Sequence, residues 1–209
     1  MHGKTAEFVD LQRQMAEARK KAGLPGRWVW QEVRGDSSTY HIVSFEKNLA
    51  AFDELGDNAM SDAESARWID RITAITHTRK VANVQLYSDL VIDPNPGYQP
   101  NLLRLTERRI KQGYGQAYRK WLTEKQIPMR KKLGGTGYSV GKTILGGNTN
   151  TWTTAQHFSS WAEMDKPGIF SKLSAEEREE LFASSRELVI DTHTILARYR
   201  SDMSNDDPK

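Results

Sequence analysis

A carboxylate and two tryptophans are the side chains whose types and spacing could do chemistry. Trp28, Trp30 and Glu32 occupy alternate positions of a run, residues 27–33, that is rich in aromatic and β-branched residues. Because alternate side chains of a β-strand point to the same side, all three are predicted to share one face of a sheet. The indoles could stack an aromatic molecule while the carboxylate moves a proton. The plainer interpretation is that the tryptophans fill a core and Glu32 pairs with Arg198.

Two histidines could share the proton transfer. His41 and His157 each fall at the third-strand position of a repeated pattern described below. No histidine belongs to a closely spaced ligand pair, and a site built on these two needs a third ligand, such as Glu32 or Glu163. We therefore expect no metal site and treat Glu32, His41 and His157 as the candidate catalytic residues.

Other chemical motifs fail on their spacing or composition. The segment 137–143 is similar to a phosphate-binding loop, but its spacer before Gly-Lys-Thr has the wrong length, and Lys142 falls inside a predicted strand. No nucleophile-elbow sequence occurs. The chain has no cysteine, which excludes disulfides, thiolate catalysis and cysteine-ligated metals.

Composition sets the outer limits. With 209 residues and 37% hydrophobic content, the chain can bury a sizeable core and has room for two small subdomains. Its 30 basic and 27 acidic residues are interspersed, and the basic stretches 108–111 and 120–132 are predicted to be solvated surface rather than a nucleic-acid site. No apolar run approaches a membrane span, and no apolar signal core precedes residue 20. A cytoplasmic location is expected, with a mature secreted or periplasmic form left open.

The elements that position these residues come from a pattern that occurs twice. Residues 20–30 return as residues 131–141, with five of eleven positions identical: two lysines, two glycines and a valine. The similarity continues in both directions, with turns absorbing small changes of offset. Such self-similarity at a nearly fixed offset indicates a duplicated supersecondary unit.

Each copy predicts a helix, two strands, a helix and a strand. In the first copy the expected elements are a helix over 8–18, strands over 27–33 and 39–45, a helix opened by a capping box at Ser61, and a strand over 84–92. In the second copy they are strands over 102–110, 138–145, 151–158 and 195–200, a helix around Trp121, and a helix capped at Ser174 with His193 near its end.

The second copy therefore has the order β-α-β-β-α-β of the ferredoxin-like split unit. The fold class is predicted to be α+β, with tandem ferredoxin-like repeats whose antiparallel sheets pack into a pseudo-dimeric barrel. The first copy lacks its first strand. The expected boundaries are residues 1–93 for the first repeat, 94–100 for a Pro/Gly linker, 101–204 for the second repeat and 205–209 for a frayed tail.

The two copies differ on the face that is predicted to line the barrel. Trp28, Trp30 and Glu32 align with the small residues Ser139, Gly141 and Thr143. Bulky aromatics opposite small polar residues predict a cavity with an aromatic wall, the usual make-up of a small-molecule pocket. Alternation along the last strand of each copy adds further candidates. The ligand-binding candidates are Trp28, Trp30, Gln85, Tyr87, Thr143 and Arg198.

In element order, and in the helix entry Gly-Lys-Thr-Ala-Glu-Phe at residues 3–8, the chain resembles the dimeric α+β barrel superfamily in a tandem-duplicated, single-chain form. That superfamily includes antibiotic-biosynthesis monooxygenases, haem-degrading monooxygenases, small polyketide cyclases and stress-responsive proteins. The resemblance implies oxygenation, cyclisation or proton transfer on an aromatic or polyketide-like substrate, with no tightly held cofactor. The haem-degrading branch fits less well, because its asparagine, histidine and tryptophan find no matching positions here.

Two functions remain open from the sequence. In the first, Trp28 and Trp30 stack the substrate, Glu32 or a histidine moves a proton, and Arg198 holds an anionic oxygen. In the second, the barrel is non-catalytic, stress-related or structural, and acts through oligomerisation at a sheet edge or helices. The expected partners are a small-molecule ligand and further copies of the chain, with no nucleic acid and no membrane.

Overall fold

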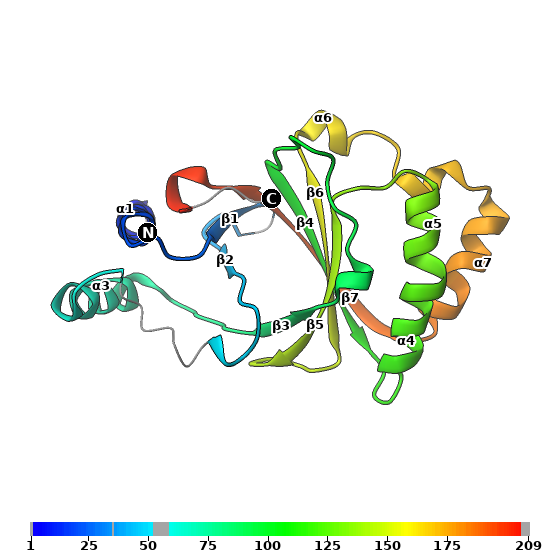
Figure 1. Ribbon diagram of the computed structural model, residues 1–209, viewed down its shortest axis with the longest axis horizontal. Helices are drawn as coiled ribbons and strands as arrows, with labels where there is room; N and C mark the ends of the chain where they lie inside the picture. The colour runs from blue at the N-terminus through cyan, green and yellow to red at the C-terminus, as the bar shows by residue number, and fades with distance from the viewer. Residues whose placement is uncertain (1, 35, 52–58, 206–209) are drawn as a thin grey trace. The chain divides into compact units, whose positions relative to one another are not determined.

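The computed structural model describes residues 2–34, 36–51 and 59–205, which fall into two compact units (Figure 1). Unit 1 comprises residues 1–79 and 198–209, and unit 2 comprises residues 80–197. The first 79 residues supply helix α1 (His2–Lys21), strands β1 (Arg27–Arg34) and β2 (Tyr40–Ser44), and helix α3 (Asp62–Ile75).

The remaining chain continues with shorter helices between longer strands. Its first elements are strand β3 (Asn83–Leu86), the 3₁₀ turn η1 (Ser88–Leu90), strand β4 (Leu102–Ile110), helix α4 (Gly115–Trp121), the π-helical turn η2 (Leu122–Gln126) and helix α5 (Ile127–Lys132). Then follow β5 (Tyr138–Leu145), β6 (Thr151–Phe158), α6 (Trp161–Met164), η3 (Ile169–Lys172), α7 (Ala175–Arg186), β7 (Val189–Tyr199) and η4 (Ser201–Met203).

The strands hydrogen-bond in the order β2-β1-β7-β4-β6-β5-β3. The fold is therefore a mixed α+β arrangement with a seven-stranded sheet. The pairs β1–β2, β3–β5, β4–β6 and β5–β6 are antiparallel. The last two residues of β7 belong to unit 1 and the rest of this strand belongs to unit 2. Within unit 2, the segment from β4 to β7 has the element order β-α-β-β-α-β.

Strand boundaries test the sequence patterns. The strands predicted over 102–110, 138–145 and 151–158 are confirmed as β4, β5 and β6. The strand predicted over 84–92 is wrong beyond Leu86, because Leu90 N–H donates to the Tyr87 carbonyl (2.9 Å) and closes a 3₁₀ turn. The chain then rejoins the sheet only through a bridge between Ile92 and Tyr138.

The last strand is longer than predicted. It begins at Val189 rather than at residue 195, and His193 lies in this strand, not near the end of a helix as expected. Helix α7 begins with the predicted capping box at Ser174 and ends at Arg186. The residues that follow include the β-branched Val189 and Ile190, whose side chains favour an extended backbone.

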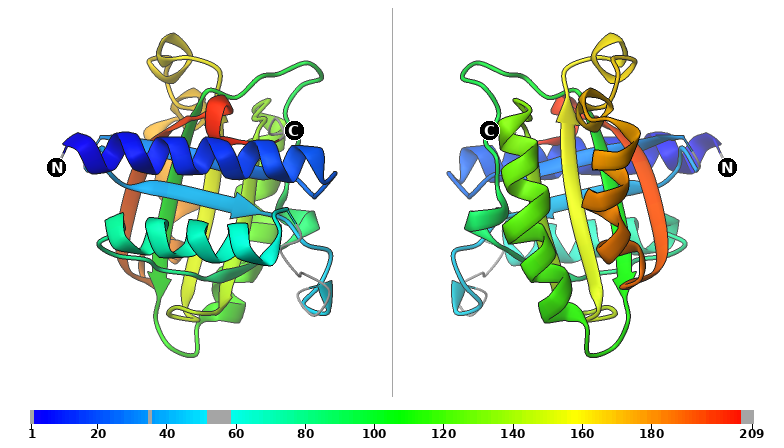
Figure 2. Two further views of the ribbon diagram at one scale, coloured as in Figure 1. Left: turned by 90° about the vertical axis from the view of Figure 1, so that its left-hand side faces the viewer. Right: turned by 90° about the vertical axis from the view of Figure 1, so that its right-hand side faces the viewer.

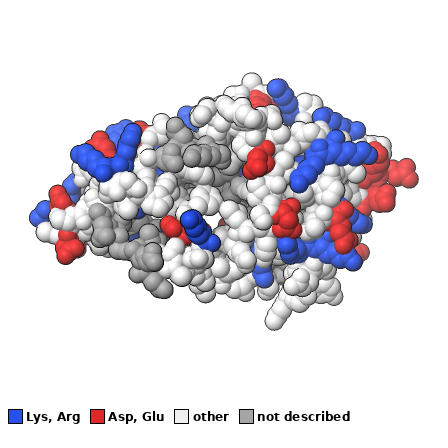
Figure 3. All heavy atoms as spheres, in the orientation of Figure 1, with Lys and Arg blue, Asp and Glu red and all other residues white. Residues whose placement is uncertain are grey.

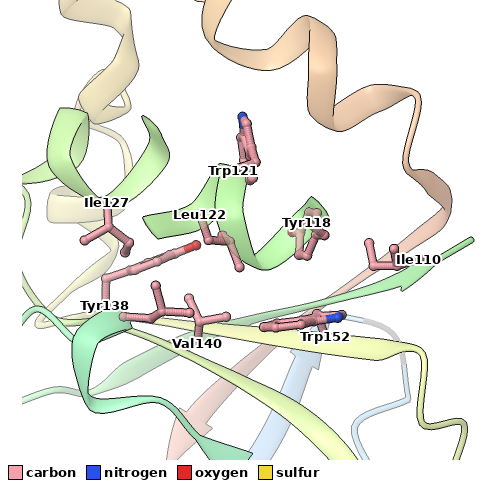
Figure 4. Packing of buried hydrophobic residues seen from close by; sticks show 9 residues of the cluster. Ile110, Tyr118, Trp121, Leu122, Ile127, Tyr138, Val140 and Trp152 are labelled. Carbon is pink, nitrogen blue, oxygen red and sulfur yellow. The ribbon is translucent and has the colours of Figure 1, made fainter. Parts of the chain in front are cut away.

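Helices cover one face of the unit 2 sheet. The run α4–η2–α5 and helix α7 lie across the strands on the same side (Figures 1 and 2). Between them and the sheet is the core shown in Figure 4, which is built from Ile110, Tyr118, Trp121, Leu122, Ile127, Tyr138, Val140 and Trp152, all less than a tenth exposed. Trp121 Nε1 donates to the Leu181 carbonyl of α7 (2.8 Å), which satisfies the one polar atom of this indole.

Helices α1 and α3 lie side by side in unit 1 (Figure 2). Trp68 Nε1 of α3 donates to the Leu11 carbonyl of α1 (2.9 Å), and Leu11 itself is fully buried. Helix α1 also packs on the hairpin, where the rings of Phe8 and Tyr40 are 4.6 Å apart. These contacts place α1 over one face of β1 and β2.

The end of the chain returns to unit 1. Asn205, the first residue of the expected frayed tail 205–209, receives a hydrogen bond from Arg27 N–H (2.8 Å) and donates to the Leu24 carbonyl (3.2 Å). Residues 206–209 lie outside the described part of the chain.

Both signs of charge occur over the unit 2 helices on the face shown in Figure 3. Among the described residues, no helix combines the length and apolar character that a membrane span requires.

Gly146 lies in the turn between β5 and β6, close to the backbone of Val81. Its substitution tests how much stability depends on this close approach. The φ of Gly146 is +74°, and an added Cβ would lie 2.2 Å from the Val81 carbonyl oxygen. We expect Gly146→Ala to lower the free energy of unfolding by about 1–3 kcal/mol, measured by urea denaturation. The matched control is Gly147→Ala, whose Cβ would meet nothing closer than 3.3 Å, at Thr143 Cγ2. Equal destabilisation by the two substitutions would contradict this reason.

Candidate functional site

The β1–β2 hairpin of unit 1 carries the candidate site, and its turn sets the register. Asp36 Oδ1 accepts hydrogen bonds from Ser38 Oγ (2.6 Å) and Ser38 N–H (2.9 Å), which lower the pKa of this carboxyl. Thr39 N–H donates to the Asp36 carbonyl (2.9 Å). The ladder that follows places Trp30 opposite His41. Because opposed residues share a face, Trp30 and His41 point to the same side of the hairpin.

Glu32 and His41 form the central contact of this site. His41 Nε2 and Glu32 Oε1 are 2.9 Å apart, with the side chains 26% and 14% exposed. Glu32 lies two residues after Trp30, so all three side chains share the face of the hairpin that is opposite to α1. A carboxylate on one imidazole nitrogen orients the ring and leaves Nδ1 as its second proton site. The arrangement can therefore take up a proton and hold it between two groups.

Two tryptophans flank the pair, and they differ in access. Trp30 is 1% exposed, and its ring centroid is 5.2 Å from that of Tyr199. Trp28 is half-buried and lies 4.8 Å from Phe45, and its Nε1 has no hydrogen-bond partner among the described residues. Of the two indoles, Trp28 retains accessible ring surface, while its Nε1 atom is buried.

The other predicted site residues come from elements outside the β1–β2 hairpin. Arg198 is exposed at the end of β7, and Glu32 pairs with His41 rather than with this arginine. Thr143 is buried on β5, where it pairs with Val84, and the neighbouring Gln85 is exposed.

Tyr87 and His157 lie within unit 2. The Tyr87 ring stacks on Trp152 at 5.4 Å, and the Arg119 guanidinium lies 4.3 Å from its centroid, so Tyr87 belongs to the core beneath the helices. His157 lies on β6 opposite Leu103, and burial lowers its pKa. The imidazole of His157 is therefore neutral near pH 7.

Sequence reasoning missed Tyr199, the aromatic neighbour of Trp30. Arg200 N–H donates to the Val29 carbonyl (2.9 Å), which brings this end of β7 beside β1. Nothing in the local pattern signals the contact, because residues 30 and 199 are joined only by the pairing of distant strands. No group of three or more His, Cys, Asp or Glu side chains that could hold a metal ion occurs in the described ranges.

Comparison with known proteins places the fold. Among solved structures, the "putative monooxygenase" of Lactobacillus acidophilus NCFM superposes with a TM-score of 0.62 at 11% identity, over 97% of this chain and 90% of that one. The "putative monooxygenase" of Fusobacterium nucleatum subsp. nucleatum gives 0.61 at 12% identity, over 93% and 85%. An anthrone oxidase-like protein gives 0.56 at 13% identity, over 100% and 92%.

These structures share their fold with this chain, and at such identities the likeness extends to the fold alone. No protein-family model and no curated protein matches the sequence. The function must therefore be argued from the site.

The half-buried His157 predicts a pH dependence of stability. Its folded-state pKa lies below the ordinary 6.5, so the folded state binds fewer protons than the unfolded chain. The associated stability is present above pH 6.5 and is lost as the pH falls through the folded-state pKa. We expect the free energy of unfolding to decrease less between pH 7.5 and 5 in His157→Gln than in the wild type.

Chemical denaturation at several pH values measures this difference. The control is His193→Gln, which changes an exposed histidine and should keep the wild-type profile. Identical profiles for all three proteins would show that His157 has no part in the pH dependence.

Proposed function

We propose that this protein is a monooxygenase-like enzyme that acts on an aromatic, polyketide-like substrate without a tightly held cofactor. The observation that carries the proposal is the Glu32–His41 contact on the face of the hairpin that also presents tryptophan. Glu32 and His41 are the proton-transfer pair, and Trp28 provides the ring surface against which the substrate stacks. Trp30, which is buried, supports the pair instead of contacting the substrate.

The architecture in this proposal is a duplicated barrel within one chain. Its first repeat covers residues 1–93, its linker residues 94–100 and its second repeat residues 101–204. Two facts support the duplication. Strand β3, from the end of the first repeat, pairs with β5 inside unit 2, while the last residues of the second repeat belong to unit 1. The last residues of each proposed repeat thus belong to the unit formed mainly by the other repeat. This exchange of C-terminal segments is expected of a fused dimer.

The chemistry begins with proton removal from an acidic carbon or phenol. The Glu32–His41 pair accepts the proton, and the resulting aromatic carbanion or enolate is the electron-rich species that reacts with dioxygen. For a methylene between two aryl rings, the overall change CH₂ + O₂ → C=O + H₂O is balanced without an external reductant. One of the structures of similar fold is named anthrone oxidase-like, and anthrone contains such a methylene.

The test is oxygen consumption with anthrone as the probe, together with chromatographic detection of the ketone product. We expect the purified protein to accelerate both above the uncatalysed rate. Removal of a general base typically costs a factor of about 10²–10⁴, so Glu32→Gln and His41→Gln should each lower kcat by at least about 10²-fold. Trp28→Ala should raise KM more than it lowers kcat.

The matched control is Glu17→Gln, which makes the same change at an exposed position of α1 and should leave kcat unchanged. Circular dichroism of each variant separates loss of activity from loss of fold. The proposal fails if the wild type accelerates neither oxygen consumption nor ketone formation, or if Glu32→Gln retains full activity. A non-catalytic role through oligomerisation then takes its place.

A further inference from the structure

Three arginines lie between the unit 2 sheet and the helices that cover it. Arg104 and Arg108 alternate along β4 with Thr106 and Ile110, and Ile110 belongs to the core beneath the helices. Arg130 comes from α5, which covers this face, and its guanidinium lies 3.8 Å from the ring centroid of Tyr138 on β5. The alternation that buries Ile110 thus also turns two cations inward.

The Arg130 side chain is short of partners. The residue is 6% exposed, and its Nε and Nη1 atoms have no hydrogen-bond partner within the part of the chain that the structure describes. Its guanidinium contacts two aromatic faces, of Tyr138 and of Phe170. Burial lowers the pKa of Arg130, and the nearby Arg104 and Arg108 lower it further. An arginine in this position gains from any anion that comes near it.

The other two arginines are held by neutral groups. Arg104 Nη2 donates to Gln156 Oε1 (2.5 Å), and Arg108 Nη1 donates to Thr154 Oγ1 (3.3 Å). Across the described residues, none of the three arginines forms an ion pair with a carboxylate. Clustered cations under a helix layer repel one another and are costly to desolvate. A bound anion would therefore stabilise this arrangement.

A groove of about 630 Å³ within unit 2 includes one arginine of this cluster, Arg108, in its lining. Tyr118 and Gln126 also line it, and Trp121 and Phe182 add aromatic surface. Gln126 is placed by the π-helical turn η2 and donates to the Tyr138 hydroxyl (3.0 Å). Such π-helical turns occur frequently at functional sites.

A second donor lies beside Arg108. The Tyr118 hydroxyl is buried, and burial raises its pKa to about 12 although the nearby Arg108 acts to lower it. The phenol therefore keeps its proton and can donate it in a hydrogen bond at neutral pH. This donor and the Arg108 guanidinium both line the groove.

The carboxylates at the groove are already paired. Glu179 contacts Arg186, and Asp191 Oδ2 is 2.5 Å from Arg109 Nη2. Arg178 adds another positive charge to the lining. The lining therefore carries three arginines against two carboxylates, together with aromatic surface.

We propose that this groove binds a small aromatic carboxylate, whose carboxylate accepts hydrogen bonds from Arg108 and Tyr118 and whose ring packs against Trp121 and Phe182. Arg104 and Arg130 supply the positive field behind the two direct donors. An aromatic ligand is favoured over inorganic phosphate because the walls are aromatic and the direct donors are two rather than a full phosphate cradle. The site shares no residue with the Glu32–His41 pair, so it stands or falls independently of the proposed enzyme.

Isothermal titration of the full chain with benzoate and 1-naphthoate tests the site, with inorganic phosphate as the comparison anion. We expect both carboxylates to bind, with 1-naphthoate tighter than benzoate because its second ring buries more apolar surface. A charge-assisted hydrogen bond is roughly twice as strong as a neutral one, so Arg108→Gln should weaken binding by about tenfold or more, and Tyr118→Phe by about threefold or more. Thermal unfolding of each variant verifies that it is folded.

The matched control is Lys131→Gln, which removes one positive charge from an exposed position next to Arg130. Unchanged affinity in this variant supports a built site. Equal weakening in Lys131→Gln and Arg108→Gln would reduce the effect to general charge attraction and overturn the proposal. No heat from either carboxylate overturns it as well, and phosphate binding as tight as that of 1-naphthoate overturns the assignment of an aromatic ligand.

Discussion

The double pairing of β6 is the constraint on which unit 2 depends. This strand matches β4 over eight residue pairs and β5 over five, and both ladders are antiparallel. With three strands locked together, every side chain on them is assigned to one of two faces. Trp152 then lies under the helices, where it contacts Tyr87 and Tyr118. A slip of one residue would exchange the two faces and expose this indole.

The same constraint explains why a polar cluster exists inside the helix layer. Once Ile110 points toward the helices, Arg104 and Arg108 must do so too, since they lie at even spacings from it on the same strand. Their long side chains reach Gln156 and Thr154 on β6, and Arg130 meets them from α5. Unit 2 thus combines an aromatic core with an arginine-lined groove under one helix layer. The polar part costs stability, and a ligand that neutralises it would return some of that cost.

In unit 1 a single β-hairpin, β1–β2, positions the candidate site. A turn organised by Asp36 sets the hairpin register, and the register alone brings Glu32 within hydrogen-bond distance of His41. Helix α1 covers the opposite face of the hairpin, so the Glu32–His41 face remains the chemically distinctive one. The solved structures named above share this fold at sequence identities of 11–13%. At such low identity the fold is retained while the residues of a functional site differ, so the site must be argued from this chain alone.

The sequence by itself determined the local elements. β-Branched alternation located three strands of unit 2, and the Ser-x-x-Glu pattern located the starts of α3 and α7. These features depend on neighbours a few residues away, so a single sequence contains all the information they need. Alternation likewise placed Trp28, Trp30 and Glu32 on one face.

Only the tertiary structure decided which distant residues meet. Strand pairing, and not local preference, brings Tyr199 beside Trp30 and His41 onto Glu32. It also extends β7 back to Val189. Arg130 of α5 is buried against the sheet, although the two residues that follow it, Lys131 and Lys132, are exposed. The physical reason is that burial and partner choice are set by contacts between residues far apart in the chain, and hydrophobic periodicity carries no record of which strand lies next to which.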